Sequence, residues 1–220
     1  MRALDVDRDA SVRACIDPLL AEIGCIDLLV NNAGRAMVGG AEETSADEAR
    51  ALFETNLFGM MRVTSAVLPA MRARRGGRII NLGSVSGFVG LPFHGVYAAS
   101  KHAVAGYSEA LRHEVRPLGI AVSLVEPAAH RTAIQMVRPA RLEADYDRGR
   151  EIVERYIRGA IDRGPDPRSV ARKVVTAATA RAPRLRYRVG GQATLAGWAR
   201  RLLPDRWFEA YLRHELRLPA

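Results

Sequence analysis

Short apolar runs alternate with longer amphipathic segments along this chain of 220 residues. The runs at 26–30, 78–82 and 120–125 are rich in β-branched residues and are bounded by Gly, Asn or Pro, which is typical of buried parallel strands. A last strand is predicted at 184–189. Strands that alternate with helices predict an α/β domain with right-handed crossovers.

The longer segments carry apolar residues at the 3.6-residue period of a helix. The segment at 45–74 opens with a capping box, in which Ser45 and Glu48 can each satisfy a backbone donor of the first turn. Residues 133–164 are irregular and rich in charge, and they form either a cover over a pocket or a plain pair of surface helices. The predicted helices are 11–23, 45–74, 96–115, 166–182, 195–203 and 205–216.

Composition indicates one folded domain and gives no sign of a membrane span. Hydrophobic residues make up 48% and charged residues 26%, which argues against disorder. We expect one domain over 1–190 and an amphipathic helical tail of the same domain over 191–220. No run of about 18 apolar residues occurs, and the first residues have no apolar signal-peptide core, so a cytoplasmic location is expected.

The two cysteines and the distribution of charge argue against a metal site and a nucleic-acid site. Cys15 and Cys25 form no framework or Cys/His cluster, so we expect no metal site and a reducing compartment. The net charge of +9 comes almost wholly from arginines spread along the chain, without a nucleic-acid-binding motif. A solvated basic surface is therefore favoured over nucleic-acid binding. Lys101 and Lys173 are the only lysines.

The pair Tyr97 and Lys101 is the first candidate for chemistry. Their four-residue spacing on the helix at 96–115 places them on one face, about one turn apart. A nearby ammonium stabilises a phenolate and lowers the tyrosine pKa, which makes the phenol a general acid or base. A surface pair without function has the same spacing.

Polar residues at strand ends support the chemical interpretation. Ser84 follows the strand at 78–82, at the edge where ligands bind open α/β sheets. The stretch 31–34, Asn-Asn-Ala-Gly, follows the strand at 26–30 and allows close backbone approach to a ligand. Asn56 lies inside a helix that it does not favour, so it is either a buried functional amide or an exposed residue.

Together these motifs resemble the short-chain dehydrogenase/reductase family in order and spacing. The stretch 83–97 is especially similar to the steroid and retinol dehydrogenase branch. The resemblance covers about 2–132 and, more loosely, extends to 190. It implies a doubly wound, Rossmann-like parallel sheet. It also implies an oxidoreductase that uses NAD or NADP to interconvert an alcohol and a ketone or aldehyde on an apolar small molecule.

The resemblance assigns roles to four catalytic candidates. Tyr97 is implied as the proton donor or acceptor, and Lys101 lowers its pKa and holds the nicotinamide ribose. Ser84 orients the substrate oxygen, and Asn56 anchors a water of the proton relay. The family also implies a homodimer or homotetramer built on the helices at 45–74 and 96–115.

The resemblance also implies cofactor contacts. Asp5 and Val6 match the pair that contacts adenine, and Asn31 lies near the adenosine ribose. The segment over the nicotinamide departs from the family, because Ala128 replaces the usual Gly and His130 replaces the usual Val or Ile. The implied cofactor-binding residues are Asp5, Val6, Asn31, Ala33, Gly34, Tyr97, Lys101, Pro127, His130 and Thr132.

The family's glycine-rich phosphate-binding turn does not occur in this sequence. The chain begins at what corresponds to the third strand, 2–6, so the fold is expected to be N-terminally truncated and to bind NAD(P) weakly. The strand at 26–30 should then have an unpaired apolar edge, and 2–6 should lose its partner or pair beside 26–30. An incomplete gene model and a genuinely truncated protein both explain this. The alternative function is a catalytically inactive fragment that acts only as a binding or oligomerisation partner.

The C-terminal helices predicted at 195–203 and 205–216 carry tryptophans, leucines and arginines. Three uses are open for such a basic amphipathic pair. It packs on another subunit, closes a pocket for an apolar substrate, or contacts a membrane surface peripherally.

Overall fold

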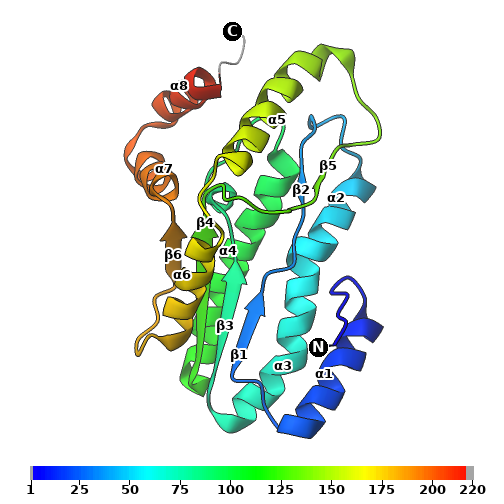
Figure 1. Cartoon of the computed structure of the whole chain (residues 1–220), viewed down its shortest axis with the longest axis vertical. Coiled ribbons are helices and arrows are strands. Elements are labelled where there is room, and N and C mark those ends of the chain that lie inside the picture. The colour runs from blue at the N-terminus through cyan, green and yellow to red at the C-terminus, as the bar shows by residue number, and fades with distance from the viewer. Residues whose placement is uncertain (1, 217–220) are drawn as a thin grey trace.

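A four-stranded parallel sheet in the order β1-β3-β4-β6 forms the centre of the molecule (Figure 1). The computed structural model describes residues 2–216. The strands predicted at 26–30, 78–82, 120–125 and 184–189 are found, with ends within two residues of the predicted ones. The strands are β1 (Leu28–Asn31), β3 (Gly77–Leu82), β4 (Ile120–Pro127) and β6 (Arg186–Val189).

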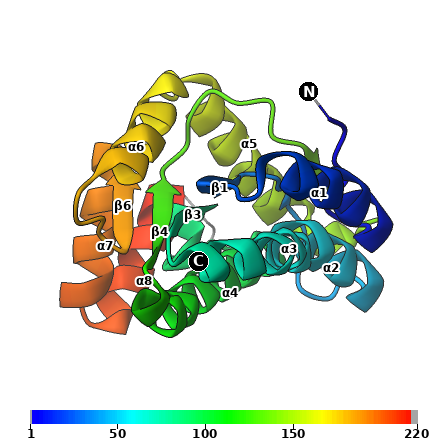
Figure 2. The same ribbon diagram turned by 90° about the horizontal axis from the view of Figure 1, so that it is seen from below.

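Helices cover the two faces of this sheet unequally, as Figure 2 shows. Ile79 of β3 packs with α1, α3 and α4, whereas its neighbour Ile80 packs on the other face with α6. No helix among residues 2–216 is long and apolar enough to cross a bilayer. The helices are α1 (Asp9–Ile23), α2 (Ala46–Phe53), α3 (Gly59–Arg74), α4 (Gly95–Val115), α5 (Asp147–Asp162), α6 (Arg168–Thr179), α7 (Gly191–Leu202) and α8 (Asp205–Leu216).

Two details differ from the predicted elements. The single helix expected at 45–74 contains a π-helical turn, Glu54–Phe58, between α2 and α3. A second, two-stranded sheet pairs β2 (Ala36–Met37) with β5 (Met136–Val137) in parallel. Two-residue strands are too short to produce an alternating pattern, so sequence reasoning could not find them.

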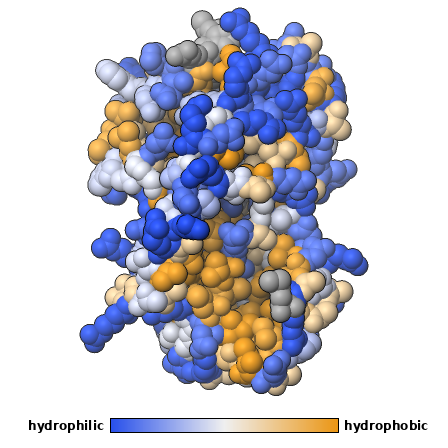
Figure 3. Space-filling model, in the orientation of Figure 1, coloured by the Kyte–Doolittle hydropathy of each residue, from blue (hydrophilic) through white to orange (hydrophobic). Residues whose placement is uncertain are grey.

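The N-terminal edge of the sheet is open. Residues 2–5 form no strand, so the strand predicted at 2–6 is wrong, because it has no neighbour to pair with. The expected unpaired edge is confirmed, since β1 pairs with β3 alone. Leu28 and Val30 of β1 are 39% and 38% exposed. Figure 3 shows apolar surface in the lower half of the molecule, where Figure 1 places β1 and β3.

The segment at 133–164 folds as β5 followed by the single long helix α5, and not as a helix pair. α5 lies near the carboxyl ends of the strands (Figure 1). Its Arg150 forms a buried ion pair with Glu43, which precedes α2, so α5 is tied to the body of the domain. The pair of C-terminal helices is confirmed as α7 and α8.

Candidate active site

The carboxyl end of β3 brings the first candidate residues together. The turn after β3 is fixed by the Ser84 hydroxyl, which accepts a hydrogen bond of 3.1 Å from the Ser86 N–H. Lys101 reaches the same strand end from α4, and its Nζ donates to the Leu82 carbonyl over 2.9 Å. Ser84 and Lys101 are 9% and 6% exposed, so both lie in a largely dry site.

Tyr97 completes this cluster from α4. Its ring centroid is 5.9 Å from Lys101 Nζ, as the four-residue spacing on one helix predicts. Tyr97 is only 8% exposed, and the Ser84 side chain lies near enough to its phenol to influence its pKa. Ser84, Tyr97 and Lys101 are therefore adjacent, as expected from the strand-end and helix-face argument.

Burial dominates the electrostatics of this cluster. It raises the pKa of Tyr97 above its ordinary value, although the Ser84 side chain acts in the opposite direction. It lowers the pKa of Lys101 to about 8, because the ammonium loses its water. The pKa of Tyr97 is thus shifted upward by burial, opposite to the lowering that was expected from Lys101.

Asn56 is buried in the π-helical turn, a feature that often marks functional sites. Its Oδ1 accepts from the Arg35 N–H, and its Nδ2 donates to the Arg35 carbonyl and to Ser100 Oγ, at 2.9, 3.0 and 3.0 Å. Both amide hydrogens are used, so the side chain joins the segment after β1 to α4. A relay water at Asn56 stays a prediction. Because both side-chain N–H groups are used, such a water would have to donate its hydrogen bond to an oxygen of Asn56.

Comparisons with known proteins agree with this geometry. A family model described as short chain dehydrogenase matches residues 1–143. The uncharacterized oxidoreductase YusZ of Bacillus subtilis is 36% identical over 97% of this chain and 79% of its own length. The chain belongs to the short-chain dehydrogenase family.

Other members of the short-chain dehydrogenase family match in sequence or structure. Human retinol dehydrogenase 8 is 44% identical over 56% of this chain and 39% of its own length. A short-chain dehydrogenase structure from Streptomyces avermitilis has a TM-score of 0.81 at 32% identity and covers 98% of this chain and 76% of that one. A Burkholderia phymatum member in complex with NAD has a TM-score of 0.76 at 32% identity, over 90% and 72% of the two chains.

Two cofactor candidates of this short-chain dehydrogenase direct their side chains elsewhere. Asn31 Nδ2 donates to Thr64 Oγ1 and Asn81 Oδ1, at 3.1 and 2.9 Å, beneath the sheet rather than toward a ribose. His130 is buried, with Nδ1 2.8 Å from the Ala128 carbonyl and Nε2 2.8 Å from Ser169 Oγ. The side-chain N–H groups of Asn31 and both ring nitrogens of His130 are therefore already engaged.

Other cofactor candidates lie around the strand ends. A Cβ on Gly34 would lie 3.2 Å from Asn56 Oδ1 and 3.7 Å from Lys101 Nζ, so a side chain there would crowd the cluster. Val6 packs against Gly59 of α3, and Asp5 is exposed before α1. Ala33 and Thr132 are exposed, and Pro127 ends β4.

The residues present fit one end of a nicotinamide dinucleotide better than its middle. Tyr97 and Lys101 present a phenol and an ammonium where a ribose and a carbonyl could meet. The family's glycine-rich turn (T-G-x-x-x-G-x-G), the usual cradle for a pyrophosphate, does not occur within residues 2–216. The described residues therefore fit the nicotinamide end of such a cofactor better than its phosphates.

Sequence reasoning missed a polar cluster beside Asn56. The Arg35 guanidinium forms an ion pair of 2.9 Å with Asp7 and hydrogen bonds with Thr55 Oγ1. Thr55 in turn donates to Asp7 over 2.9 Å. These residues lie up to 48 positions apart, and no local period reports contacts over such separations. A charged residue directly after Gly34 was the one available signal.

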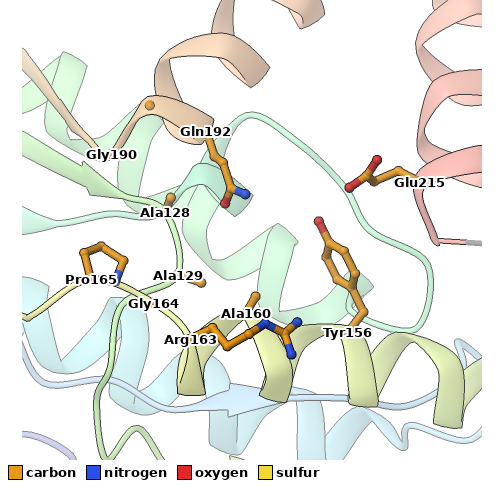
Figure 4. Close-up of a pocket in the computed structure, with 11 residues that line it drawn as sticks. Ala128, Ala129, Tyr156, Ala160, Arg163, Gly164, Pro165, Gly190, Gln192 and Glu215 are labelled. Atoms are coloured by element: carbon orange, nitrogen blue, oxygen red, sulfur yellow. The ribbon is translucent and has the colours of Figure 1, made fainter.

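A cavity of about 360 Å³ opens beside the carboxyl ends of β4 and β6 (Figure 4). Ala128 and Ala129, which follow β4, form one wall. Tyr156 of α5, Gln192 of α7 and Glu215 of α8 direct their side chains into the space, as Figure 4 shows. α5 thus covers a pocket, which favours that interpretation of 133–164 over a plain surface segment.

Proposed function

We propose that this chain is an NAD(P)-dependent oxidoreductase that interconverts an alcohol and a ketone or aldehyde on an apolar small molecule. The observation that carries the proposal is the contact of Ser84 with Tyr97, with Lys101 against the end of the same strand. Membership of the short-chain dehydrogenase family and the NAD-bound structural relative support the same reaction class.

Each residue of the cluster has a chemical role in this proposal. Tyr97 gives a proton to the carbonyl oxygen in reduction and takes one from the hydroxyl in oxidation. A raised pKa keeps the phenol protonated at neutral pH, which suits the reductive direction. Ser84 holds the reacting oxygen beside the phenol, and Lys101 would hold the nicotinamide ribose. The cofactor, when bound, supplies or accepts the hydride.

The relatives support the proposed substrate class. Ala128, Ala129 and Ala160 contribute apolar atoms to the cavity, whereas Arg163, Gln192 and Glu215 contribute polar ones. Relatives named for retinol, 3-ketodihydrosphingosine and estradiol are 36–44% identical to this chain over the parts that match. We infer a substrate with a large hydrocarbon part, whose reacting carbon sits at Tyr97.

The test compares two tyrosines of α4. Tyr97→Phe should abolish reduction of apolar ketones and aldehydes by NADH or NADPH, because the proton donor is lost. Tyr107→Phe removes a hydroxyl from the same helix, where Tyr107 lies half-buried outside the cluster, and should leave turnover unchanged. Turnover by Tyr97→Phe close to that of the wild type would contradict the proposal.

A second candidate is a fragment that acts by binding a partner, and the open edge of β1 favours it. On this proposal the chain occurs as a homodimer or homotetramer, with contacts through α3 and α4 or through the β1 edge. Sedimentation velocity on the purified chain distinguishes these states. Turnover that persists at dilutions where the chain is monomeric would argue against an obligatory partner.

A further inference from the structure

His94 and Tyr97 lie ring against ring at the start of α4. Their centroids are 4.4 Å apart and their planes are inclined by 38°. His94 is 5% exposed and Tyr97 is 8% exposed, so both rings are enclosed by protein. Two buried rings in such close contact restrict one another's tilt.

The backbone of β2 fixes the imidazole. Nδ1 of His94 lies 2.6 Å from the Met37 carbonyl oxygen. A carbonyl only accepts, so Nδ1 carries the proton and Nε2 is the bare nitrogen. Burial lowers the pKa of His94 to about 4, which leaves the ring neutral at neutral pH. His94 therefore acts on Tyr97 by packing and not by charge.

The residue before His94 has an unfavourable backbone conformation. Phe93 has a φ of 57°, in the left-handed region that bulky residues rarely adopt. Its carbonyl accepts a hydrogen bond of 2.8 Å from the Gly39 N–H. Two hydrogen bonds thus hold residues 93 and 94 against the segment of β2 and the glycine after it. Surroundings that hold such strain often belong to a functional site.

The Phe93 ring extends the contact to α5. It meets Tyr146 edge-on, with centroids 6.0 Å apart and planes inclined by 67°. A Cβ on Gly149 of α5 would lie 2.7 Å from two atoms of the Phe93 ring, so the helix backbone rests directly on that ring. One dipeptide therefore touches both α5, which lines the cavity, and Tyr97.

We propose that His94 is a positioning residue for Tyr97. Its imidazole, anchored to the Met37 carbonyl, holds the phenol at the end of β3 within reach of Ser84. Phe93 contacts α5, the helix that covers the cavity. The positions of α5 and of the Tyr97 phenol are therefore coupled through residues 93 and 94. This inference rests on the proposed role of Tyr97 as acid and base.

Two substitutions separate the two parts of the contact. His94→Asn keeps a donor for the Met37 carbonyl and removes the ring, whereas His94→Phe keeps a ring and removes the donor. His102→Asn is the matched control, because His102 is exposed on the same helix and its Nδ1 contacts the Ala98 carbonyl one turn away.

The first measurement is the titration of Tyr97 by NMR of the chain labelled at tyrosine ¹³Cζ, with the signal assigned from Tyr97→Phe. Each His94 variant should move the Tyr97 midpoint to lower pH, because a displaced phenol gains water. His102→Asn should titrate as the wild type does. A folded His94 variant, of either kind, with an unchanged Tyr97 titration would overturn the inference. If His94→Asn does not fold, His94→Phe decides alone.

The second measurement is turnover. A misplaced acid should lower kcat by about 10- to 100-fold and change KM little, since substrate contacts away from the phenol remain. A merely structural role predicts a lower melting temperature with kcat and the Tyr97 titration unchanged, which contradicts positioning. The titration needs no substrate. Absence of turnover in the wild type would therefore count against the proposed function alone. The titration would still test whether His94 positions Tyr97.

Discussion

Helices α4 and α7 differ in which side chains they bury. α4 buries polar groups, among them Ser100, Lys101 and Ser108, at exposures of 6% or less. α7 exposes large apolar groups, with Leu195 at 64% and Leu202 at 71%. The difference follows from topology, since α4 packs over the central strands β3 and β4 whereas α7 lies outside β6 (Figure 2).

The buried polar groups of α4 all have partners. Ser108 accepts from Asn81 of β3 over 2.9 Å and donates to the Val104 carbonyl, and Ser100 donates to the Tyr97 carbonyl. A buried donor or acceptor without a partner costs about 1–3 kcal/mol, so these networks specify how α4 sits on the sheet. Among the described residues, no comparable network of buried polar side chains positions α7. This helix buries the small residues Ala193 and Gly197 and turns its larger side chains outward.

The largest expected difference between the two regions is the cost of shortening a leucine. Leu124→Ala in β4, beneath α4, should reduce the free energy of unfolding by about 2–5 kcal/mol, because a fully buried side chain leaves a cavity. Leu202→Ala in α7 should change it by less than about 0.5 kcal/mol. Urea denaturation measures both. Equal losses would mean that α7 is packed in solution.

The contribution of Lys101 to the free energy of unfolding depends on pH. Its folded pKa of about 8 lies below the unfolded value of 10.5, so the unfolded chain binds more protons between these values and stability rises with pH across them. From pH 8 to 9.5 this gain is about 2 kcal/mol. Lys101→Met should lose it, whereas Arg201→Met in the exposed tail should keep it. Parallel stability curves for wild type and Lys101→Met would show that the ammonium is not desolvated.

Phe208 tests how firmly the tail is docked. It is the large apolar residue of α8 that is most enclosed after Leu216, at 6% exposure, and it lies under the Arg200 guanidinium at 5.5 Å. Phe208→Ala should cost about 1–3 kcal/mol, less than a central core residue, because the site can relax toward solvent. Hydrogen exchange in α8 should quicken while exchange in β3 stays slow. Uniform quickening would place α8 in the same cooperative unit as the sheet.

Trp198 should give the smallest change in stability. It is 54% exposed on α7, and Trp198→Ser should alter the free energy of unfolding by less than about 0.5 kcal/mol. Its removal should still reduce binding of an apolar dye and any self-association, because the exposed apolar area shrinks. Dye fluorescence and light scattering provide the readouts. If both stay at wild-type values, the apolar surface of α7 has no part in association.

Local patterns determined a large part of this protein. Short apolar, β-branched runs predicted β1, β3 and β4, because the strands of a parallel sheet leave an apolar signature. The four-residue spacing of Tyr97 and Lys101, and the position of Ser84 after β3, predicted that these three side chains lie together. The same patterns indicated α7 and α8 as amphipathic, although they left open what would cover them.

Only the tertiary structure showed which polar side chains are already hydrogen-bonded within the protein. Asn31 and His130 looked available in sequence, yet both are engaged by partners 33 to 50 positions away. His94 carried no motif, and its role depends on the approach of β2 and α5 to one turn of α4. The sign of the Tyr97 pKa shift also needed the fold, because burial is the sum of contacts from many segments and spacing along one helix reports only one of them.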